Sequence, residues 1–375
     1  MPAPKIHIVS FDVPYPPDYG GAIDVFYKVK NLAAAGADIY LHCFQYGRER
    51  SETLEQLCKQ VWYYPRITGI PGISLKLPYI VYSRRSSLLL KRLAEIKAPI
   101  LFEGVHSSLY LSHPAISDQY KAVRIHNIEH DYYAKLAARE HNVLKKQYYL
   151  TESTFLRRYE DKLDAAQAFF SLSSADDHYF AKCYPAKQHA FIGPFHPYEQ
   201  VISTTGTGTY CLYHGNLSHA ENVEAVLFLF REVFSKTSVP FIIAGRKPVA
   251  EVINACKQLP TCKLVADPDA ETLAQLVRDA QIHVLPTFQA TGMKLKLLYA
   301  LFSGRHVLVN TPMLHGTGLN DCCNVADTAQ DMLGCINGLV TKPFTIEDIN
   351  SRSAILGQHY NNHKNAERLL TFLQH

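Results

Sequence analysis

Two lysines at the start of an expected helix are suited to bind an anion. In segment 291–304, Gly292 precedes Lys294 and Lys296, and the segment lies between two apolar strands. A helix N-terminus offers free backbone N–H groups and the positive end of the helix dipole. Lysine is unfavourable there unless an anion compensates its charge, so the pair predicts a phosphate site. The alternative is that both lysines extend into solvent.

Two other patterns place metal-binding residue types close together. His126, Glu129 and His130 have the spacing of a zinc motif in which two histidines lie one helical turn apart. Residues 123–125 are typical of a strand ending just before His126, so we do not expect both histidines on one helix. The acidic residues in 267–269 precede another expected helix, and we interpret them as helix caps.

The elements that must position these residues alternate between strand and helix along the whole chain. Short apolar runs such as 5–10, 122–125, 241–245 and 306–310 are typical of buried strands, and helical patterns separate them. The expected fold is α/β, with two doubly wound Rossmann-like domains facing a cleft. The expected domains are residues 1–196, a linker at 197–208, a second domain at 209–345, and helices at 346–375 that pack back on the first domain.

Composition excludes several classes of protein. The 375 residues are 47% hydrophobic and 19% charged, which is ordinary for a globular protein of about two domains. A net charge of +4 is too weak for a dedicated nucleic-acid binder, so we expect no nucleic-acid partner. Nine cysteines without paired spacing and no signal-peptide pattern predict a cytoplasmic protein.

No apolar run is long enough to span a bilayer, but one stretch could touch its surface. Residues 84–97 set basic side chains beside an apolar face formed by Leu89, Leu93 and Ile96. This pattern is compatible with peripheral contact at the inner face of a membrane or with a lipid-diphosphate acceptor. The alternative is a helix that packs its apolar side and leaves its charges in solvent.

Taken together, these motifs resemble the family-four glycosyltransferases, which have the GT-B fold. The resemblance covers nearly the whole chain, and it rests on the order and spacing of several pieces. These are the Gly-x-Lys-x-Lys pattern at 292–296, the Pro/Gly loop at 14–21, and the segments 123–133, 213–216, 242–246 and 273–286. The resemblance implies retaining transfer of a sugar from a nucleotide diphosphate donor to an acceptor, with no required metal.

The resemblance also implies roles for individual residues. The second domain would hold the nucleotide and the first the acceptor. His126 matches the histidine near the transferred sugar, where an imidazole can bind a hydroxyl or assist the leaving group. The residues expected to contact the donor phosphates are Gly20, Gly21, Gly215, Asn216, Arg246, Gly292, Lys294 and Lys296. The alternatives are a plain turn at Gly20 and Gly21 and a structural histidine at position 126.

The chain departs from the family at two pairs of positions. Thr291 and Tyr299 occupy the positions of two glutamates in the family, one of which binds the ribose hydroxyls. The resemblance therefore places these two residues in the ribose or base region. Asn216 and Asn222 stand near the family's basic pair. Lysines can bind phosphate in place of the missing basic pair, but they cannot replace a carboxylate that binds the ribose hydroxyls.

We therefore expect a glycosyltransferase that takes a nucleotide-sugar donor and a glycan or lipid-linked acceptor in surface polysaccharide assembly. No cofactor or metal is expected. Two alternatives remain open. One is a catalytically silent protein that binds a nucleotide sugar or a partner on the same fold, and the other is a sugar-nucleotide epimerase.

Overall fold

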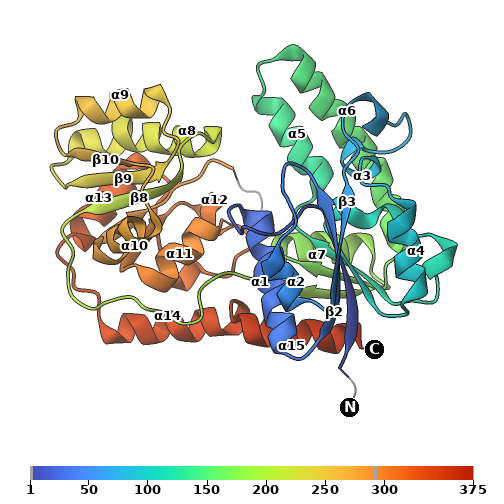
Figure 1. The fold of residues 1–375 in the computed structure, drawn as a ribbon. Helices are drawn as coiled ribbons and strands as arrows, with labels where there is room; N and C mark the ends of the chain where they lie inside the picture. The colour runs from blue at the N-terminus through green and yellow to red at the C-terminus, as the bar shows by residue number, and fades with distance from the viewer. Residues whose placement is uncertain (1–2, 290–293, 375) are drawn as a thin grey trace. The chain divides into compact units, whose positions relative to one another are not determined.

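The chain folds into two compact α/β units, which are described separately. The computed structural model describes residues 3–289 and 294–374 (Figure 1). Unit 1 comprises Met1–Pro197 and Tyr360–His375, and unit 2 comprises Tyr198–His359. Each unit is built on a parallel sheet flanked by helices, which confirms the expected α/β class.

Unit 1 contains a seven-stranded sheet within its described residues. Its order is β3-β2-β1-β4-β5-β6-β7, and every neighbouring pair is parallel. The strands are β1 (Lys5–Ser10), β2 (Asp38–Gln45), β3 (Gln60–Pro65), β4 (Ile100–Glu103), β5 (Lys121–Ile125), β6 (Ala168–Ser171) and β7 (Gln188–Phe191). The strand order reverses between β1 and β4, so the carboxyl ends of these strands border the switch point of the sheet.

Helices cover both faces of this sheet. They are α1 (Gly20–Ala34), α2 (Glu52–Leu57), α3 (Tyr79–Tyr82), α4 (Ser87–Glu95), α5 (Glu129–Arg139), α6 (Val143–Glu160), α7 (Ser174–Cys183) and α15 (Asn362–Leu373), with 3₁₀ turns at Ile70–Gly72, Val105–Tyr110, Pro114–Ile116 and Asp161–Ala165. Alternate strand residues point to opposite faces and supply two separate cores. In β1, Ile6 and Ile8 belong to one core and Val9 to the other.

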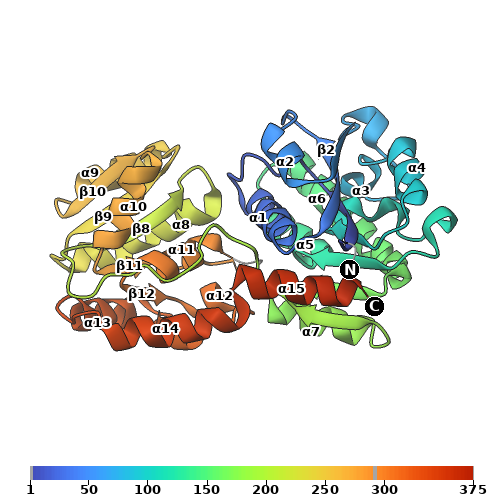
Figure 2. The same cartoon turned by 60° about the horizontal axis from the view of Figure 1, so that its bottom comes forward.

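The expected C-terminal helical stretch consists of two helices in different units. α15 lies beside α1 in both views (Figures 1 and 2), and Phe372 packs its ring 5.3 Å from that of Phe170 in β6. α14 (Ile346–His359) belongs to unit 2. Its Arg352 is buried and donates hydrogen bonds to the backbone carbonyls of Leu301 and Gly304, which ties the helix to that unit.

Unit 2 repeats the same architecture with a six-stranded sheet in its described residues. The order is β10-β9-β8-β11-β12-β13, again all parallel. The strands are β8 (Cys211–Asn216), β9 (Phe241–Arg246), β10 (Cys262–Ala266), β11 (Ile282–Val284), β12 (His306–Val309) and β13 (Asn324–Val325). Here the order reverses between β8 and β11.

The helices of unit 2 follow its strands in alternation. They are α8 (Ala220–Phe228), α9 (Ala250–Gln258), α10 (Ala270–Asp279), α11 (Leu295–Ser303), α12 (Thr311–Leu314), α13 (Ala329–Leu339) and α14, with short turns at Leu229–Val233, Phe234–Lys236 and Asn320–Cys322. Asp269 caps α10 by accepting a hydrogen bond from Thr272 N at 2.7 Å, which confirms the interpretation of segment 267–269 as a cap. Among the described residues, no helix has the length and apolar character needed to cross a bilayer.

Candidate functional site

The carboxyl edge of the unit 1 sheet brings together residues from three separate segments. β1 leads through a loop into Gly20 and Gly21, the first residues of α1, while β4 ends at Glu103 and His126 follows β5. Because β1 and β4 flank the switch point, this edge is where such a sheet offers a crevice to a ligand. The structure thus brings three of the predicted site residues to one suitable edge.

Phe11 links the glycines to the histidine. Its ring centroid is 5.4 Å from that of His126, and a Cβ on Gly21 would stand 2.7 Å from its Cζ. Gly21 therefore has a packing role that the sequence did not indicate. α1 begins after Tyr19, which makes no side-chain cap, so the first-turn N–H groups lack helical partners.

His126 and Glu103 form a hydrogen-bonded pair. His126 Nε2 lies 3.2 Å from Glu103 Oε2, with 10% of the histidine side chain exposed and the carboxylate fully buried. Lys28 Nζ lies 2.8 Å from both carboxylate oxygens. Burial opposes ionisation of Glu103, but Lys28 and His126 hold its pKa below the ordinary value. The ionised carboxylate accepts from Nε2–H, so Nδ1 is the ring nitrogen that this hydrogen bond leaves available to a ligand.

Asp24 and Arg124 extend this pair into a buried network. Asp24 Oδ2 accepts from Lys28 Nζ at 2.9 Å, and Arg124 Nη2 donates to Asp24 Oδ1 at 3.1 Å. Burial would raise the pKa of Asp24, but Arg124 and Lys28 hold it far below its ordinary value. Two carboxylates therefore face two cations in the interior, and His126 stands at the partly exposed end of the network.

The same network contains the one group of side chains in the described residues whose spacing could suit a metal ion. Ligand atoms of Asp24, Glu103 and His126 all lie within 4.8 Å of one another. Lys28 Nζ already bonds both carboxylates and supplies the positive charge that a metal would bring. His130 pairs instead with Glu160, at 2.6 Å, and α5 begins only at residue 129. His126 therefore lies before α5 and His130 lies on it, which confirms that the two histidines of the pattern do not share one helix.

A second titratable pair lies at the same edge. His106 Nδ1 is 3.9 Å from Glu129 Oε1, and the rings of His106 and Phe11 are 5.4 Å apart. Glu129 is buried, and burial raises its pKa to about 8. At neutral pH its carboxyl group is therefore mainly protonated and can donate a hydrogen bond to a hydroxyl oxygen.

At the corresponding edge of unit 2, β8 and β11 border the switch point. β8 ends at Gly215 and Asn216, and α11 starts at Leu295 with Lys294 as its N-cap residue. The chain approaches itself closely here, because a side chain on Gly245 would collide with the carbonyl oxygen of Gly215. The predicted donor-contacting residues in the described part of unit 2 therefore share one edge.

Asn216 and Arg246 differ in their availability to a ligand. Asn216 Oδ1 accepts from Ser218 N and Oγ at 3.0 and 2.8 Å, so its side chain serves the turn after β8. Arg246 pairs with Asn216 in the sheet register and is exposed at the end of β9. Of these two predicted residues, Arg246 is the one that offers a charge to an anion.

Lys294 and Lys296 bind partners within unit 2, so the alternative that both extend into solvent is wrong. Lys294 Nζ is 2.9 Å from Glu221 Oε1, and the same carboxylate accepts from Thr287 Oγ1 at 2.5 Å. Despite its burial, Glu221 has a lowered pKa because Lys294 and Thr287 stabilise its ionised form. A carboxylate thus stands at the place where the sequence predicted a phosphate.

Lys296 is the more buried of the two lysines. Its Nζ lies 3.0 Å from Tyr213 Oη and 2.5 Å from Asn222 Oδ1, and it stands 4.9 Å above the Tyr213 ring. Burial lowers its pKa to about 8, although Glu221 opposes the shift. Lys296 is therefore a cation close to its titration point at the edge of the sheet.

Tyr299 lies in an aromatic cluster. Its ring stacks on Tyr198 at 5.3 Å with an interplanar angle of 7°, and it meets the His214 ring edge to face at 5.6 Å. Aromatic faces can stack on a base but cannot accept hydrogen bonds from ribose hydroxyls as a carboxylate does. The other predicted residues, Thr291 and Gly292, lie outside the described residues.

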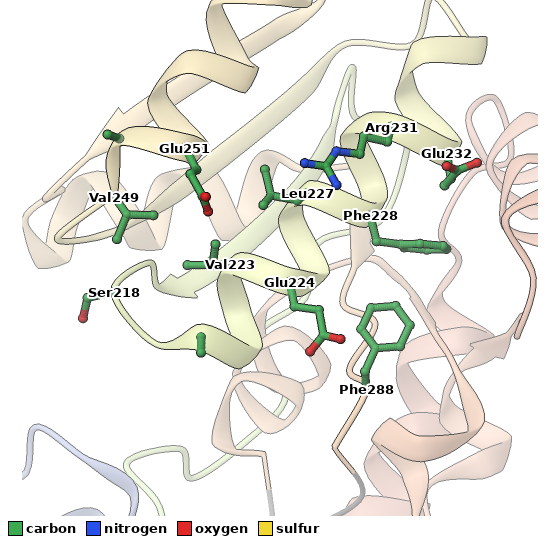
Figure 3. Close-up of a pocket in the computed structure, with 12 residues that line it drawn as sticks. Ser218, Val223, Glu224, Leu227, Phe228, Arg231, Glu232, Val249, Glu251 and Phe288 are labelled. Carbon is green, nitrogen blue, oxygen red and sulfur yellow. The ribbon is translucent and has the colours of Figure 1, made fainter. Parts of the chain in front are cut away.

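A cavity of about 870 Å³ lies between α8 and the start of α9 (Figure 3). Phe228 and Phe288 meet edge to face at 5.2 Å in its wall, and Glu224, Glu232 and Arg231 line it as well. Its described lining includes none of the predicted site residues. Ser218 of its lining donates to Asn216, and Val249 and Ala250 follow β9, so the cavity borders the carboxyl edge of the unit 2 sheet.

Residues 84–97 use their apolar face for packing. Leu89 and Leu93 of α4 are fully buried in a core of unit 1, and Arg84 is buried with hydrogen bonds to backbone carbonyls. Arg92 stacks on Trp62 at 5.1 Å. This burial favours the interpretation of the segment as a packed helix over one that presents its apolar face to a membrane.

The sequence analysis missed the acidic partners in both units. Asp24 and Lys28 have the i, i+4 spacing of an ordinary surface pair, but both lie on the buried face of α1. Glu103 and Glu221 are separated by more than 70 residues from the lysines they bind. The signal available in the sequence was charge on the otherwise apolar face of α1.

No protein-family model matches the chain. The chain is similar to an uncharacterised 44.6 kDa protein from the cps region of Klebsiella pneumoniae, with 26% identity over 342 residues, which are 84% of this chain and 85% of that protein.

Solved structures match the chain over almost its full length. The sucrose-phosphate synthase of Thermosynechococcus elongatus gives a TM-score of 0.66 at 12% identity, covering 99% of this chain and 98% of that one. The lipopolysaccharide outer core galactosyltransferase WaaB gives 0.64 at 12% identity, covering 99% and 100%. The UDP-forming trehalose-phosphate synthase of Burkholderia xenovorans gives 0.62 at 10% identity, covering all of both chains. The chain therefore has the GT-B fold of glycosyltransferases, which confirms the resemblance at the level of the fold.

Proposed function

We propose that this protein transfers a sugar from a nucleotide diphosphate sugar to a glycan or lipid-linked acceptor, with retention at the anomeric carbon. The observation that carries the proposal is the charged edge at the switch point of each sheet within a GT-B fold. His126 stands at one edge, and Lys294 and Lys296 stand at the other. The similarity to a protein of a cps region supports a role in surface polysaccharide assembly.

Unit 2 is the proposed donor side because it holds cations near its switch point. Lys294 and Arg246 can each donate charge-assisted hydrogen bonds to phosphate oxygens, worth about 1.5 to 3 kcal/mol per contact. Glu221 holds Lys294 in place before the donor binds. A bound diphosphate would either share Lys294 with the Glu221 carboxylate or replace that carboxylate as the partner of Lys294. Lys296, which donates to Asn222, would add a second positive charge.

Unit 1 is the proposed acceptor side because its edge offers hydrogen-bonding groups to sugar hydroxyls. Nδ1 of His126 accepts from a sugar hydroxyl, and the protonated carboxyl of Glu129 donates to one. Neither group repels a neutral sugar. We propose transfer without a metal or other cofactor, because Lys294 and Lys296 supply positive charge at the edge of unit 2.

The test is a calorimetric titration with nucleoside diphosphates and nucleotide sugars, with and without magnesium, followed by product analysis of the donor that binds. Sugar transfer to an acceptor supports the proposal, and retention is read from the anomeric configuration of the product. Stereochemical inversion of the free donor would instead identify an epimerase. Folded protein that binds nothing in the panel would overturn the donor side of the proposal.

A second candidate is a catalytically silent protein that binds a nucleotide sugar or a partner. Two observations favour it. Both lysines already have partners within unit 2, and Tyr299 stacks on Tyr198 where the family has a carboxylate. Saturable binding of a nucleotide sugar without turnover on any acceptor would select this candidate.

A further inference from the structure

A long stretch of unit 1 is basic and contains no acidic residue. Between Glu55 and Glu95 the chain carries positive charge alone. The basic residues are Lys59, Arg66, Lys76, Arg84, Arg85, Lys91 and Arg92. Such a run creates a local positive potential that favours an anionic partner.

Aliphatic side chains project from the middle of this stretch. Ile70 begins the short turn Ile70–Gly72 and is 85% exposed, and Leu75, which follows the turn, is 90% exposed. Lys76 follows directly and is exposed. Isolated exposed aliphatic residues are common, but several in one short segment beside lysines need a partner to explain them.

The start of α6 shows the same combination. Val143 is 78% exposed and Leu144 is 83% exposed, and both precede Lys145 and Lys146. Every residue in 141–148 is exposed, so the first turn of this helix is open to solvent. Lys145 pairs with Glu140 at 2.8 Å, while Lys146 has no acidic partner among the described residues.

The two segments are neighbours in space. Glu152 of α6 accepts a hydrogen bond from Tyr79 N at 2.9 Å, and Tyr148, one turn earlier, interacts electrostatically with Tyr79 and Arg66. The Tyr79 hydroxyl in turn accepts from Gly69 N at 3.2 Å, next to Ile70. In Figure 1 the segment after β3 runs beside α6. The exposed residues of both segments therefore form one surface.

We propose that this surface binds an anionic lipid bilayer. The basic-apolar patch consists of Ile70, Ile73, Leu75, Lys76, Val143, Leu144, Lys145 and Lys146. Aliphatic tips can enter the headgroup region of a bilayer while neighbouring lysines bind its anionic phosphates. In both segments exposed aliphatic residues are followed directly by lysines, and this combination favours a bilayer over a protein partner, whose docking face would need matching carboxylates.

Binding of this kind is peripheral and reversible. Each lysine near an anionic surface strengthens binding about fivefold, and salt weakens that contribution. The proposal does not rest on sugar transfer, because it concerns a surface of unit 1 that contains none of His126, Glu103 or the glycines of α1. Membrane binding would bring the protein to a lipid-linked acceptor. Vesicle binding can nevertheless be measured without donor or acceptor, so its outcome is independent of sugar transfer.

The experiment is sedimentation of the full chain with vesicles of phosphatidylcholine alone and of phosphatidylcholine with 30% phosphatidylglycerol. We expect binding to the anionic vesicles that exceeds binding to the neutral ones by tenfold or more and that falls with added salt. Ile70→Ser with Leu75→Ser, and separately Val143→Ser with Leu144→Ser, should each weaken it at least fivefold. Lys76→Gln with Lys146→Gln should weaken it about twentyfold.

Ile202→Ser and Ile346→Ser are the matched controls, since these residues are 56% and 53% exposed in unit 2. Both should bind vesicles as the unaltered chain does, and thermal melting should show that every variant is folded. Absence of binding by the folded chain, or equal losses in patch and control variants, would overturn the proposal. Self-association that only the patch variants abolish would assign the surface to a second copy of the chain instead.

Discussion

Glu103 fixes the orientation of His126 through a single hydrogen bond, with Oε2 lying 3.2 Å from Nε2. The carboxylate can do so because Lys28 neutralises it from the other side at 2.8 Å. The imidazole is therefore held by a charged network whose other members are buried, and its second nitrogen is left for a substrate.

His126→Ala should lower the kcat of sugar transfer about 100-fold or more. An imidazole that binds a reacting sugar or assists a leaving group contributes on this scale. The measurement is initial rates at saturating donor. His130→Ala is the matched control, because His130 pairs with Glu160 rather than with Glu103. Equal losses in the two variants would remove His126 from the site.

Lys28→Met should destabilise the protein by about 3 to 5 kcal/mol. Removing this buried cation leaves Asp24 and Glu103 with uncompensated charge in the interior. The free energy of unfolding in urea measures the effect. Lys30→Met, on the exposed side of the same helix, should change it by less than about 1 kcal/mol. A small loss for Lys28→Met would show that the network is not stabilised by this cation.

The central strands could be predicted because they are buried on both faces and form continuous apolar runs. β3, β7 and β13 were not predicted. They lie at the edges of their sheets and contain residues that are not buried, such as Gln188, which is exposed, and His189, which is partly buried, in β7. An edge strand needs fewer apolar residues, so the pattern that marks a central strand is missing.

The candidate site was predictable where a motif marked it and unpredictable where distant residues pair. The pattern around Lys294 and Lys296 located one edge, and the strand before His126 located the other. Glu221 could not be assigned, because its contact with Lys294 spans 73 residues and exists only once β8 and β11 lie side by side. Tertiary pairing of this kind leaves no periodic signal in a sequence.

Lys294→Ala should weaken binding of a nucleoside diphosphate at least tenfold, whereas Glu221→Gln should strengthen it about three- to tenfold. The lysine donates to phosphate, while the carboxylate competes for the same lysine and repels the anion. Calorimetric titration measures both. Glu271→Gln, exposed on α10, should have no effect. Weaker binding by Glu221→Gln would show that the carboxylate contacts the donor directly.

Binding of a nucleoside diphosphate should weaken about tenfold between pH 7 and pH 9. Burial lowers the pKa of Lys296 to about 8, so its ammonium group is mainly charged at pH 7 and mainly neutral at pH 9. A bound anion favours the charged form, and affinity therefore falls as the proton is lost. Lys296→Met should bind weakly with little pH dependence, and Lys294→Ala should keep the dependence. A flat profile in the unaltered chain would exclude Lys296 from the anion site.

Several buried histidines should make the protein unstable in mild acid. They are His7, His42, His214 and His283, and burial lowers the pKa of each. For His7 the value falls to about 4 and for His283 to about 3. Below pH 6.5, the ordinary pKa of histidine, the unfolded chain binds protons that the folded chain does not. The free energy of unfolding therefore decreases as the pH is lowered. Each such histidine costs about 1.4 kcal/mol per pH unit in that range.

The free energy of unfolding should therefore fall by at least about 2 kcal/mol between pH 6 and pH 5. Glu129 offsets one histidine, because its pKa is raised to about 8 and its folded form holds a proton that the unfolded chain releases above pH 4.5. Urea unfolding at each pH measures the sum. His219→Gln, an exposed control, should leave the slope unchanged. Stability that stays level or rises on acidification would mean that the buried imidazoles bind protons in the folded state.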